Sequence, residues 1–219
     1  MPAILIIVLV GLLESGCSFL PKVYEYHDPL TPQEHLALGV SYESEGNADL
    51  AIAEYKKVIE SKAPGQSVTA RVFLGNVYAG LEQYDAAEQY YREALSLDPH
   101  RGQALNNLAA LYVKQGTLLN QAESLARTAV NQTESENQPR EKGIYLETLG
   151  EVLLQQGRYS EALESFHQAE AFRVKPFGLV QLYTNMADAY ERLGQLEDAQ
   201  QARQRAEKFR ESGTSSGGS

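Results

Sequence analysis

A short string of residues that returns five times along the chain constrains the fold more than any other sequence feature. Each copy has an apolar residue, then Gly or Ala, and in four of the five copies a Tyr three residues later. The copies are Leu38–Tyr42, Leu74–Tyr78, Leu108–Tyr112, Leu149–Leu153 and Met186–Tyr190. Their small residues, Gly39, Gly75, Ala109, Gly150 and Ala187, are 36, 34, 41 and 37 residues apart. Such self-similarity predicts an array of similar structural units.

A second string follows each copy after a turn, with an Ala and usually a larger residue four positions later. These strings are Ala51–Tyr55, Ala87–Tyr91, Ala122–Ala126, Ala162–Phe166 and Ala199–Arg203. Gly-centred turns at Gly46, Gly116, Gly157 and Gly194 separate the two strings in four of the units. Pro64, Pro99 and Pro176 are expected near the ends of the second helices. Each unit is therefore predicted to be a pair of antiparallel helices, with small residues at the helix contacts.

The pattern resembles the tetratricopeptide repeat, whose period is about 34 residues. The resemblance covers Pro32–Arg210 and implies an all-α, right-handed superhelical solenoid of about five helix-turn-helix repeats. The repeats are expected at about 32–65, 68–101, 102–136, 143–176 and 180–211. We expect the tyrosines of the first string, Tyr42, Tyr78, Tyr112 and Tyr190, to fill space between neighbouring helices as part of the core.

Two regions depart from the repeat. Asn131–Lys142 is polar and carries the extra residues between the third and fourth copies, so it is either an extended loop or a longer helix end with a loop. The segment Glu197–Glu211 is highly polar, and a terminal repeat has no successor to cover its outer face, which predicts a capping helix. Residues 212–219 are rich in Gly and Ser and are predicted to form a flexible tail.

The N-terminal residues resemble a bacterial lipoprotein signal. An apolar run, Ala3–Leu13, is too short to span a bilayer and is followed by Ser15-Gly16-Cys17. The resemblance implies a signal peptide over 1–16, a lipidated Cys17 and a tether over 17–31. Glu14 replaces the usual Leu, and no Lys or Arg precedes the run, so an ordinary signal peptide or an uncleaved anchor remains an alternative. Ser18 favours the outer membrane, because in lipoproteins an Asp directly after the lipidated Cys is the signal for retention in the inner membrane.

Charge and motifs exclude several classes of function. The chain has 29 Asp and Glu against 19 Lys and Arg, which argues against nucleic-acid binding. The single cysteine excludes an intrachain disulfide. His27, His35, His100 and His167 form no helical pair, and no phosphate-binding, metalloprotease or nucleophile-elbow motif occurs. We therefore expect no enzyme activity, no metal and no cofactor.

The first helices of such a solenoid line a concave face, where members of the family usually bind extended segments or helices of a partner. Positions predicted to face inward include Gln33, Leu36, Val40, Thr69, Ile144 and Gln181. Polar members of this face are the candidate site, namely Asn76, Asn106, Asn107, Lys114, Glu147, Glu151, Asn185 and Asp188. Asn107 and Asn185 match an asparagine ladder that some members use to hold a peptide backbone.

The acidic residues Glu147, Glu151 and Asp188 favour a basic or polar peptide partner. A subfamily that binds C-terminal carboxylates is excluded, because its basic positions are Val72, Ile144 and Thr148 here. The sequence thus predicts a non-enzymatic scaffold for protein–protein interaction, anchored in the bacterial envelope as an outer-membrane lipoprotein that faces the periplasm. A pilotin-like assembly factor for a secretin or pilus, or a scaffold on an uncleaved anchor, is the alternative. The oligomeric state and the partner's identity stay open.

Overall fold

The computed structural model describes residues 28–136, 138–172 and 178–215, and within these ranges every regular element is an α-helix. Ten helices follow one another in five antiparallel pairs, which confirms the predicted all-α repeat architecture. They are α1 (Pro32–Ser44), α2 (Ala48–Glu60), α3 (Pro64–Gly80), α4 (Tyr84–Leu97), α5 (Gly102–Gln115), α6 (Leu119–Glu136), α7 (Pro139–Gln155), α8 (Tyr159–Phe172), α9 (Leu179–Arg192) and α10 (Leu196–Ser215).

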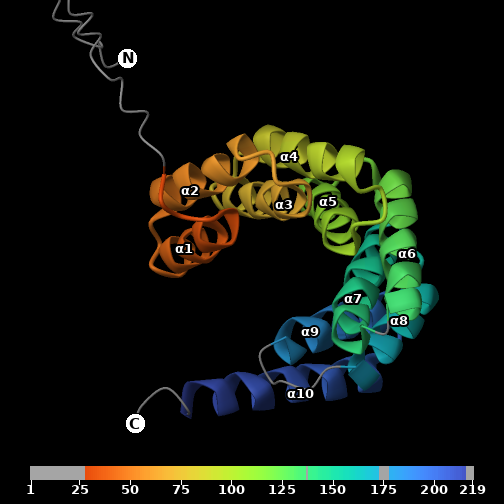
Figure 1. The fold of residues 1–219 in the computed structure, drawn as a ribbon. Coiled ribbons are helices and arrows are strands. Elements are labelled where there is room, and N and C mark those ends of the chain that lie inside the picture. Colours follow the sequence, from red (N-terminus) through yellow and green to blue (C-terminus); the bar gives the residue numbers. More distant parts are fainter. Residues whose placement is uncertain (1–27, 137, 173–177, 216–219) are drawn as a thin grey trace, which may run out of the picture.

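The pairs form a curved arc in which the odd-numbered helices line the inside and the even-numbered helices the outside (Figure 1). Each helix packs mainly on its partner in the pair and on the next pair along the chain. This nearest-neighbour packing is characteristic of solenoids. We call the side of the arc that α1, α3, α5, α7 and α9 line the inner face.

The predicted turns lie between the two helices of each pair. Gly46, Gly116, Gly157 and Gly194 have φ between 64° and 78°, which is the left-handed region that glycine adopts without a steric cost. In the second pair the same conformation falls on Glu82, with φ of 60°. A non-glycine residue therefore makes the turn that the Gly-centred motif did not mark.

Three inner-helix glycines lie against aromatic rings of the following outer helix, sixteen residues later. A Cβ atom on Gly39, Gly75 or Gly150 would lie 2.3, 2.3 or 2.4 Å from the nearest ring carbon of Tyr55, Tyr91 or Phe166. These three rings are almost completely buried. The small residues of the first string thus make room for an aromatic side chain, and this contact sets how closely each helix pair packs.

The tyrosines of the first string are only partly the core that the sequence predicts. Tyr112 is fully buried, whereas Tyr42, Tyr78 and Tyr190 are partly buried and pack against the edges of the hydrophobic clusters. Apart from Tyr112, the most deeply buried rings come from the outer helices, where Tyr55, Tyr91 and Phe166 point back onto the inner-helix glycines.

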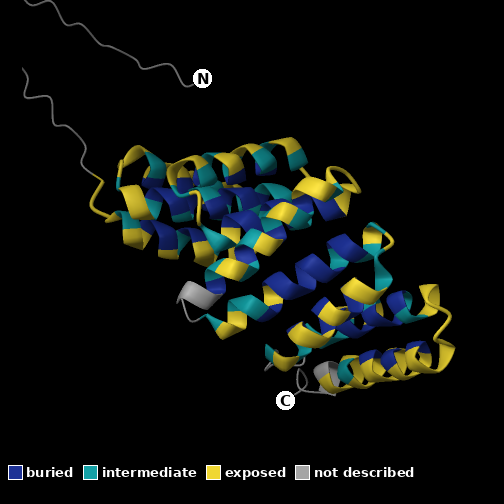
Figure 2. Ribbon diagram, turned by 90° about the vertical axis from the view of Figure 1, so that its right-hand side faces the viewer, coloured by how far each residue is buried: buried dark blue, intermediate teal, exposed yellow. Residues whose placement is uncertain are grey.

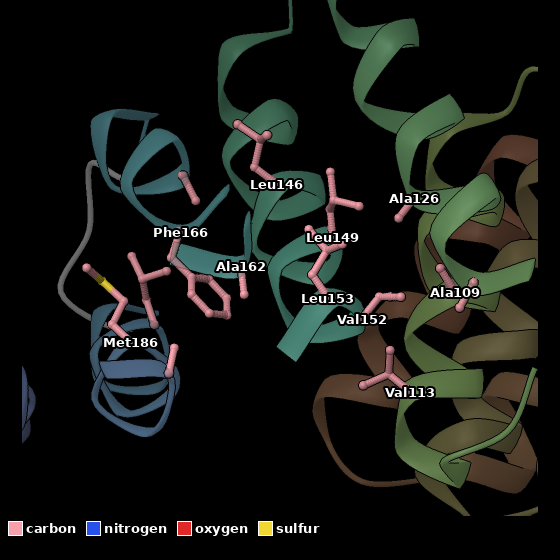
Figure 3. Close-up of a cluster of buried hydrophobic side chains, with 14 of the residues drawn as sticks. Ala109, Val113, Ala126, Leu146, Leu149, Val152, Leu153, Ala162, Phe166 and Met186 are labelled. Atoms are coloured by element: carbon pink, nitrogen blue, oxygen red, sulfur yellow. The ribbon is translucent and has the colours of Figure 1, made fainter. Parts of the chain in front are cut away.

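The largest hydrophobic cluster extends from α4 to α10 and centres on α7. Figure 3 shows Leu149, Val152 and Leu153 of α7 between side chains of the third repeat on one side and side chains of α8 and α9 on the other. The side chains on the two sides are Ala109, Val113 and Ala126, and Ala162, Phe166 and Met186. The core is therefore continuous from repeat to repeat.

The helix ends differ from the predicted ones at several places. Pro64, expected near the end of the second helix, is instead the first residue of α3. Proline is tolerated there because the first N–H groups of a helix have no partner within the helix. In the polar stretch Asn131–Lys142, α6 continues to Glu136 and α7 begins at Pro139. The longer helix end is therefore the correct alternative, and the extended loop is wrong.

The last helix, α10, covers the predicted capping segment and is exposed along most of its length (Figure 2). Ala199, Ala202 and Ala206 form its buried stripe. It continues to Ser215, so the first part of the predicted flexible tail is helical.

The predicted signal peptide and Cys17 lie outside the described residues, as does most of the predicted tether. The end of the tether is described, and it is held on the first repeat. Thr31 caps α1 in a capping box with Glu34, and Asp28 lies 3.6 Å from Lys57. In the part of the chain that the structure describes, no helix is long and apolar enough to cross a membrane.

Candidate functional site

The inner face begins, at the N-terminal end, with an open apolar hollow between α1 and α3. It has a volume of about 600 Å³ and is lined by apolar Leu36, Ala37, Val40 and Phe73, by polar Gln33, Gln66 and Thr69, and by Gly65. Val40 is 47% exposed, although it is a large apolar side chain. The hollow therefore presents apolar surface to a ligand, and Phe73 and Ala37 are members that the sequence analysis did not assign to the face.

The centre of the inner face carries a pair of asparagines on neighbouring inner helices. Asn107 Nδ2 of α5 donates to Asn76 Oδ1 of α3 at 2.7 Å, and the Tyr91 hydroxyl donates to the same oxygen at 2.9 Å. Two donors on one oxygen fix the orientation of the Asn76 amide. Its NH₂ group has no partner among the residues that the structure describes, so it is free to donate to a ligand.

Beside this pair, Asn106 is buried with an oxygen that accepts no hydrogen bond. The residue is 4% exposed, its Nδ2 lies 3.5 Å from Asn107 Oδ1, and its Oδ1 has no hydrogen-bond partner. A buried acceptor left unsatisfied costs about 1–3 kcal/mol. The structure thus brings the three predicted asparagines together, and one of them retains an unused acceptor.

At the C-terminal end of the inner face, a chain of side-chain contacts joins α9 to α7. Gln181 Nε2 donates to Asn185 Oδ1 at 2.8 Å, and Asn185 Nδ2 donates to Glu151 Oε1 at 2.8 Å. Burial raises the pKa of the Glu151 carboxyl, and the hydrogen bond from Asn185 only partly offsets this effect. Glu151 therefore holds a charge in a poorly solvated position.

The remaining predicted site residues do not form a continuous acidic surface. Glu147 is only 8% exposed, and Asp188 pairs with Arg192 on its own helix at 3.3 Å. Lys114, on the exposed end of α5, lies over the ring of Tyr84 with its nitrogen 5.1 Å from the ring centroid. Glu151 combines a groove position with a hydrogen bond from Asn185 on the neighbouring inner helix.

The inner face also contains a cation that the sequence analysis missed. Arg101, in the turn before α5, donates to Thr69 Oγ1 at 3.2 Å, and its Nε is buried without a partner. The repeat register predicts inward positions only within the first helices, whereas Arg101 lies in the turn before one. Val72 and Thr148, two of the positions that carry cations in the carboxylate-binding subfamily, are buried.

No group of three His, Cys, Asp or Glu side chains within residues 28–136, 138–172 and 178–215 is arranged to hold a metal ion. The hydrogen-bonding groups of the inner face are instead spread over successive helices, which suits an extended ligand.

Comparisons with known proteins agree with the geometry. Two sequence profiles described as tetratricopeptide repeat match the chain. One matches residues 69–101, and the other matches residues 35–63 and 180–211. No curated protein sequence matches the chain significantly.

Several solved structures share the fold. BtubC from P. vanneervenii is 18% identical with a TM-score of 0.71, over 83% of this chain and 80% of that one. PilF from Pseudomonas aeruginosa is 23% identical with a TM-score of 0.69, over 81% and 76%. A MamA protein from Desulfovibrio magneticus RS-1 is 13% identical with a TM-score of 0.64, over 83% and 96%. The matched repeats, together with five described helix pairs, establish that the chain belongs to the tetratricopeptide-repeat family.

Proposed function

We propose that the protein is a non-enzymatic scaffold that binds a segment of a partner protein on its inner face. The observation that carries the proposal is the row of hydrogen-bonding groups on successive inner helices, from Asn76 and Asn107 to Asn185 and Glu151. Amides offer donor and acceptor together, so such a row suits a peptide backbone. Tetratricopeptide-repeat proteins generally act as scaffolds of this kind.

The binding test compares two sets of bulky substitutions at exposed or half-buried positions. The inner set is Val40→Trp, Thr69→Trp and Gln181→Trp, and the outer set is Leu50→Trp, Gln89→Trp and Glu164→Trp. Tagged full-length chains are purified from membranes, and the co-purified proteins are identified by mass spectrometry. We expect the inner set to lose the partners that the wild type and the outer set retain. Loss with the outer set alone would place the binding surface on the convex side.

Our proposal for the partner's charge is a basic or polar segment. It is supported by Glu151, whose carboxyl is partly desolvated and faces the groove with a single described donor, and by Asp188 nearby on α9. Charge across an interface acts mainly on association rate and salt sensitivity. Glu151→Gln and Asp188→Asn should therefore slow association and weaken its salt dependence. Glu147 is unsuitable for this test, because it is buried and a substitution there would also disturb the helix contact.

We further propose that the scaffold is held in the bacterial envelope by a lipid on Cys17, on the outer membrane and facing the periplasm. The support is the sequence alone: the apolar run Ala3–Leu13 followed by Ser15-Gly16-Cys17. Cys17→Ser should move the protein from the membrane fraction to the soluble fraction, and labelled fatty acid should enter only the wild type. Membrane retention of the variant, without label in the wild type, would favour the uncleaved anchor.

A pilotin-like role in secretin or pilus assembly is the alternative function. Its support is similarity of architecture, which PilF from Pseudomonas aeruginosa shares at the level of the fold. Deletion of the gene should then reduce the amount of assembled secretin in the outer membrane. Normal secretin assembly in the deletion strain would remove this alternative and leave the scaffold proposal in place.

A further inference from the structure

The inner face has different chemistry at its two ends. At the N-terminal end, the hollow between α1 and α3 exposes Val40 beside Phe73 and Ala37. A partly exposed apolar hollow of this size favours the burial of one large apolar side chain. No Lys or Arg lines the hollow.

The other end is rich in acceptors. Glu151 lies one helical turn after Glu147 on the same face of α7, and burial raises the pKa of its carboxyl. Glu151 Oε1 accepts a hydrogen bond from Asn185 Nδ2 of α9 at 2.8 Å, so the carboxylate lies where the two inner helices meet. A carboxylate there favours a ligand that brings hydrogen-bond donors.

A cation with several donors fits this carboxylate. Lysine and arginine carry three and five N–H donors and no acceptor. A cation near Glu151 would compensate the desolvation of its carboxylate. Between the two ends, the free NH₂ of Asn76 can donate to a backbone carbonyl group.

The distance between the two ends sets the spacing of the ligand's side chains. From the α1–α3 hollow to the α7–α9 contact are three intervals between inner helices, each about 8–10 Å. The total is about 25–30 Å, which an extended chain at about 3.3 Å per residue spans with roughly eight residues.

We propose that the inner face recognises an extended peptide segment with one large apolar side chain and, about eight residues away, one lysine or arginine. The apolar side chain enters the hollow at Val40, and the cation lies at Glu151, where α7 meets α9. This inference rests on the proposed function above, and it names the chemistry and spacing that the partner must offer.

Synthetic peptides test the spacing. Capped peptides of Ser, Gly and Gln carry one Leu and one Arg separated by about four, eight or twelve residues, in both orders. Binding to the full-length chain in mild detergent is measured by fluorescence anisotropy at low salt. We expect the spacing of about eight to bind at least about ten-fold more tightly than the other two, in one of the two orders.

Two variants with matched controls locate the two ends. Val40→Ser should abolish the advantage of Leu over Ser in the peptide, and Glu151→Gln should abolish the advantage of Arg over Gln. Leu50→Ser is the control for Val40, because Leu50 is similarly exposed at 48% but lies on the outer helix α2. Glu164→Gln on α8 is the control for Glu151.

The outcomes separate this inference from the proposed function. Equal binding at every spacing, or binding that does not depend on Arg, overturns the inference and leaves a groove that holds peptide backbones. Absence of binding by every peptide also overturns it. If the inner Trp variants nevertheless lose their cellular partners, the proposed function survives. If those variants keep their partners, both proposals fail.

Discussion

The ring of Tyr91 lies so close to Gly75 that a Cβ atom on the glycine would be 2.3 Å from ring carbon Cε1. The hydroxyl group of the same ring donates to Asn76 Oδ1 at 2.9 Å. One side chain therefore sets the packing of α3 on α4 and orients a residue of the inner face. The core and the candidate site are coupled at this point.

Gly75→Ala should destabilise the protein by about 1–3 kcal/mol, because the added methyl group forces the buried ring or its helix to move. The better helix propensity of alanine offsets part of this cost. Gly80→Ala is the control, since a Cβ there meets no atom within 4 Å. Chemical denaturation followed by circular dichroism measures both, and equal midpoints would show that the Gly75 contact is not tight.

Tyr91→Phe keeps the ring against Gly75 and removes only the hydroxyl group. We expect a loss of about 0.5–1.5 kcal/mol, which is the net worth of a typical hydrogen bond. The side-chain amide signals of Asn76 and Asn107 should shift in NMR spectra, because Asn76 loses one of its two donors. Tyr55→Phe removes an equivalent hydroxyl, bonded to Glu43 at 2.8 Å in the first repeat, and should leave both amide signals in place.

Glu151→Gln should stabilise the protein at neutral pH. Burial raises the pKa of the Glu151 carboxyl above its ordinary value of 4.5, so the fold favours the protonated form. That contribution is fully present below pH 4.5 and is lost as the pH rises through the folded-state pKa. The variant should therefore be more stable than the wild type at pH 7 and similar to it below pH 4.5.

Thermal unfolding across this pH range measures the effect. Glu164→Gln, an exposed change on α8, should follow the wild type at every pH. A Glu151→Gln variant less stable than the wild type at pH 7 would mean that the ionised carboxylate is well paired in the native protein. The cation site would then lose its physical basis.

His35→Leu should weaken the attachment of the segment before α1. The buried His35 ring lies with Nδ1 2.5 Å from Glu54 Oε2 and Nε2 3.4 Å from Asp28. Loss of the ring's polar contacts leaves the largely buried Glu54 with Lys57 as its described partner. The free energy of unfolding should fall by about 1–3 kcal/mol. Hydrogen exchange should accelerate at α1 and α2 and stay unchanged at α7 and α8. Uniform acceleration would contradict a local role.

Much of the fold could be predicted from the sequence, because packing constrains the repeated positions strongly. The spacing of Gly39, Gly75 and Gly150 identified the helix pairs, and each glycine proved to face an aromatic ring. The turn at Glu82 and the continuation of α6 to Glu136 could not be predicted from glycine positions or from an apolar pattern. A non-glycine residue can adopt a positive φ when both flanking helices hold it, and polar residues can extend a helix without an apolar stripe.

The candidate site was harder to predict, because register does not determine burial. The repeat register places Asn76, Asn107 and Glu151 on the inner helices, and each bonds to a residue of a neighbouring inner helix. Glu147, however, has the register of a groove residue and is buried, because neighbouring inner helices lie close together. Arg101 and the hollow beside Phe73 depend on contacts between repeats, which a single-repeat pattern does not contain.

Site-specific photo-cross-linking in the protein's native cells tests the central claim most directly. A photoreactive residue replaces Val40, Ile144 or Gln181 on the inner face, Leu50, Gln89 or Glu164 on the outer face, or Asn131 in the polar C-terminal part of α6. All seven side chains are exposed, so folding should be preserved. The account predicts that one and the same partner is cross-linked from the inner positions and not from the others. Cross-links that form only from the outer positions or from Asn131 would contradict it.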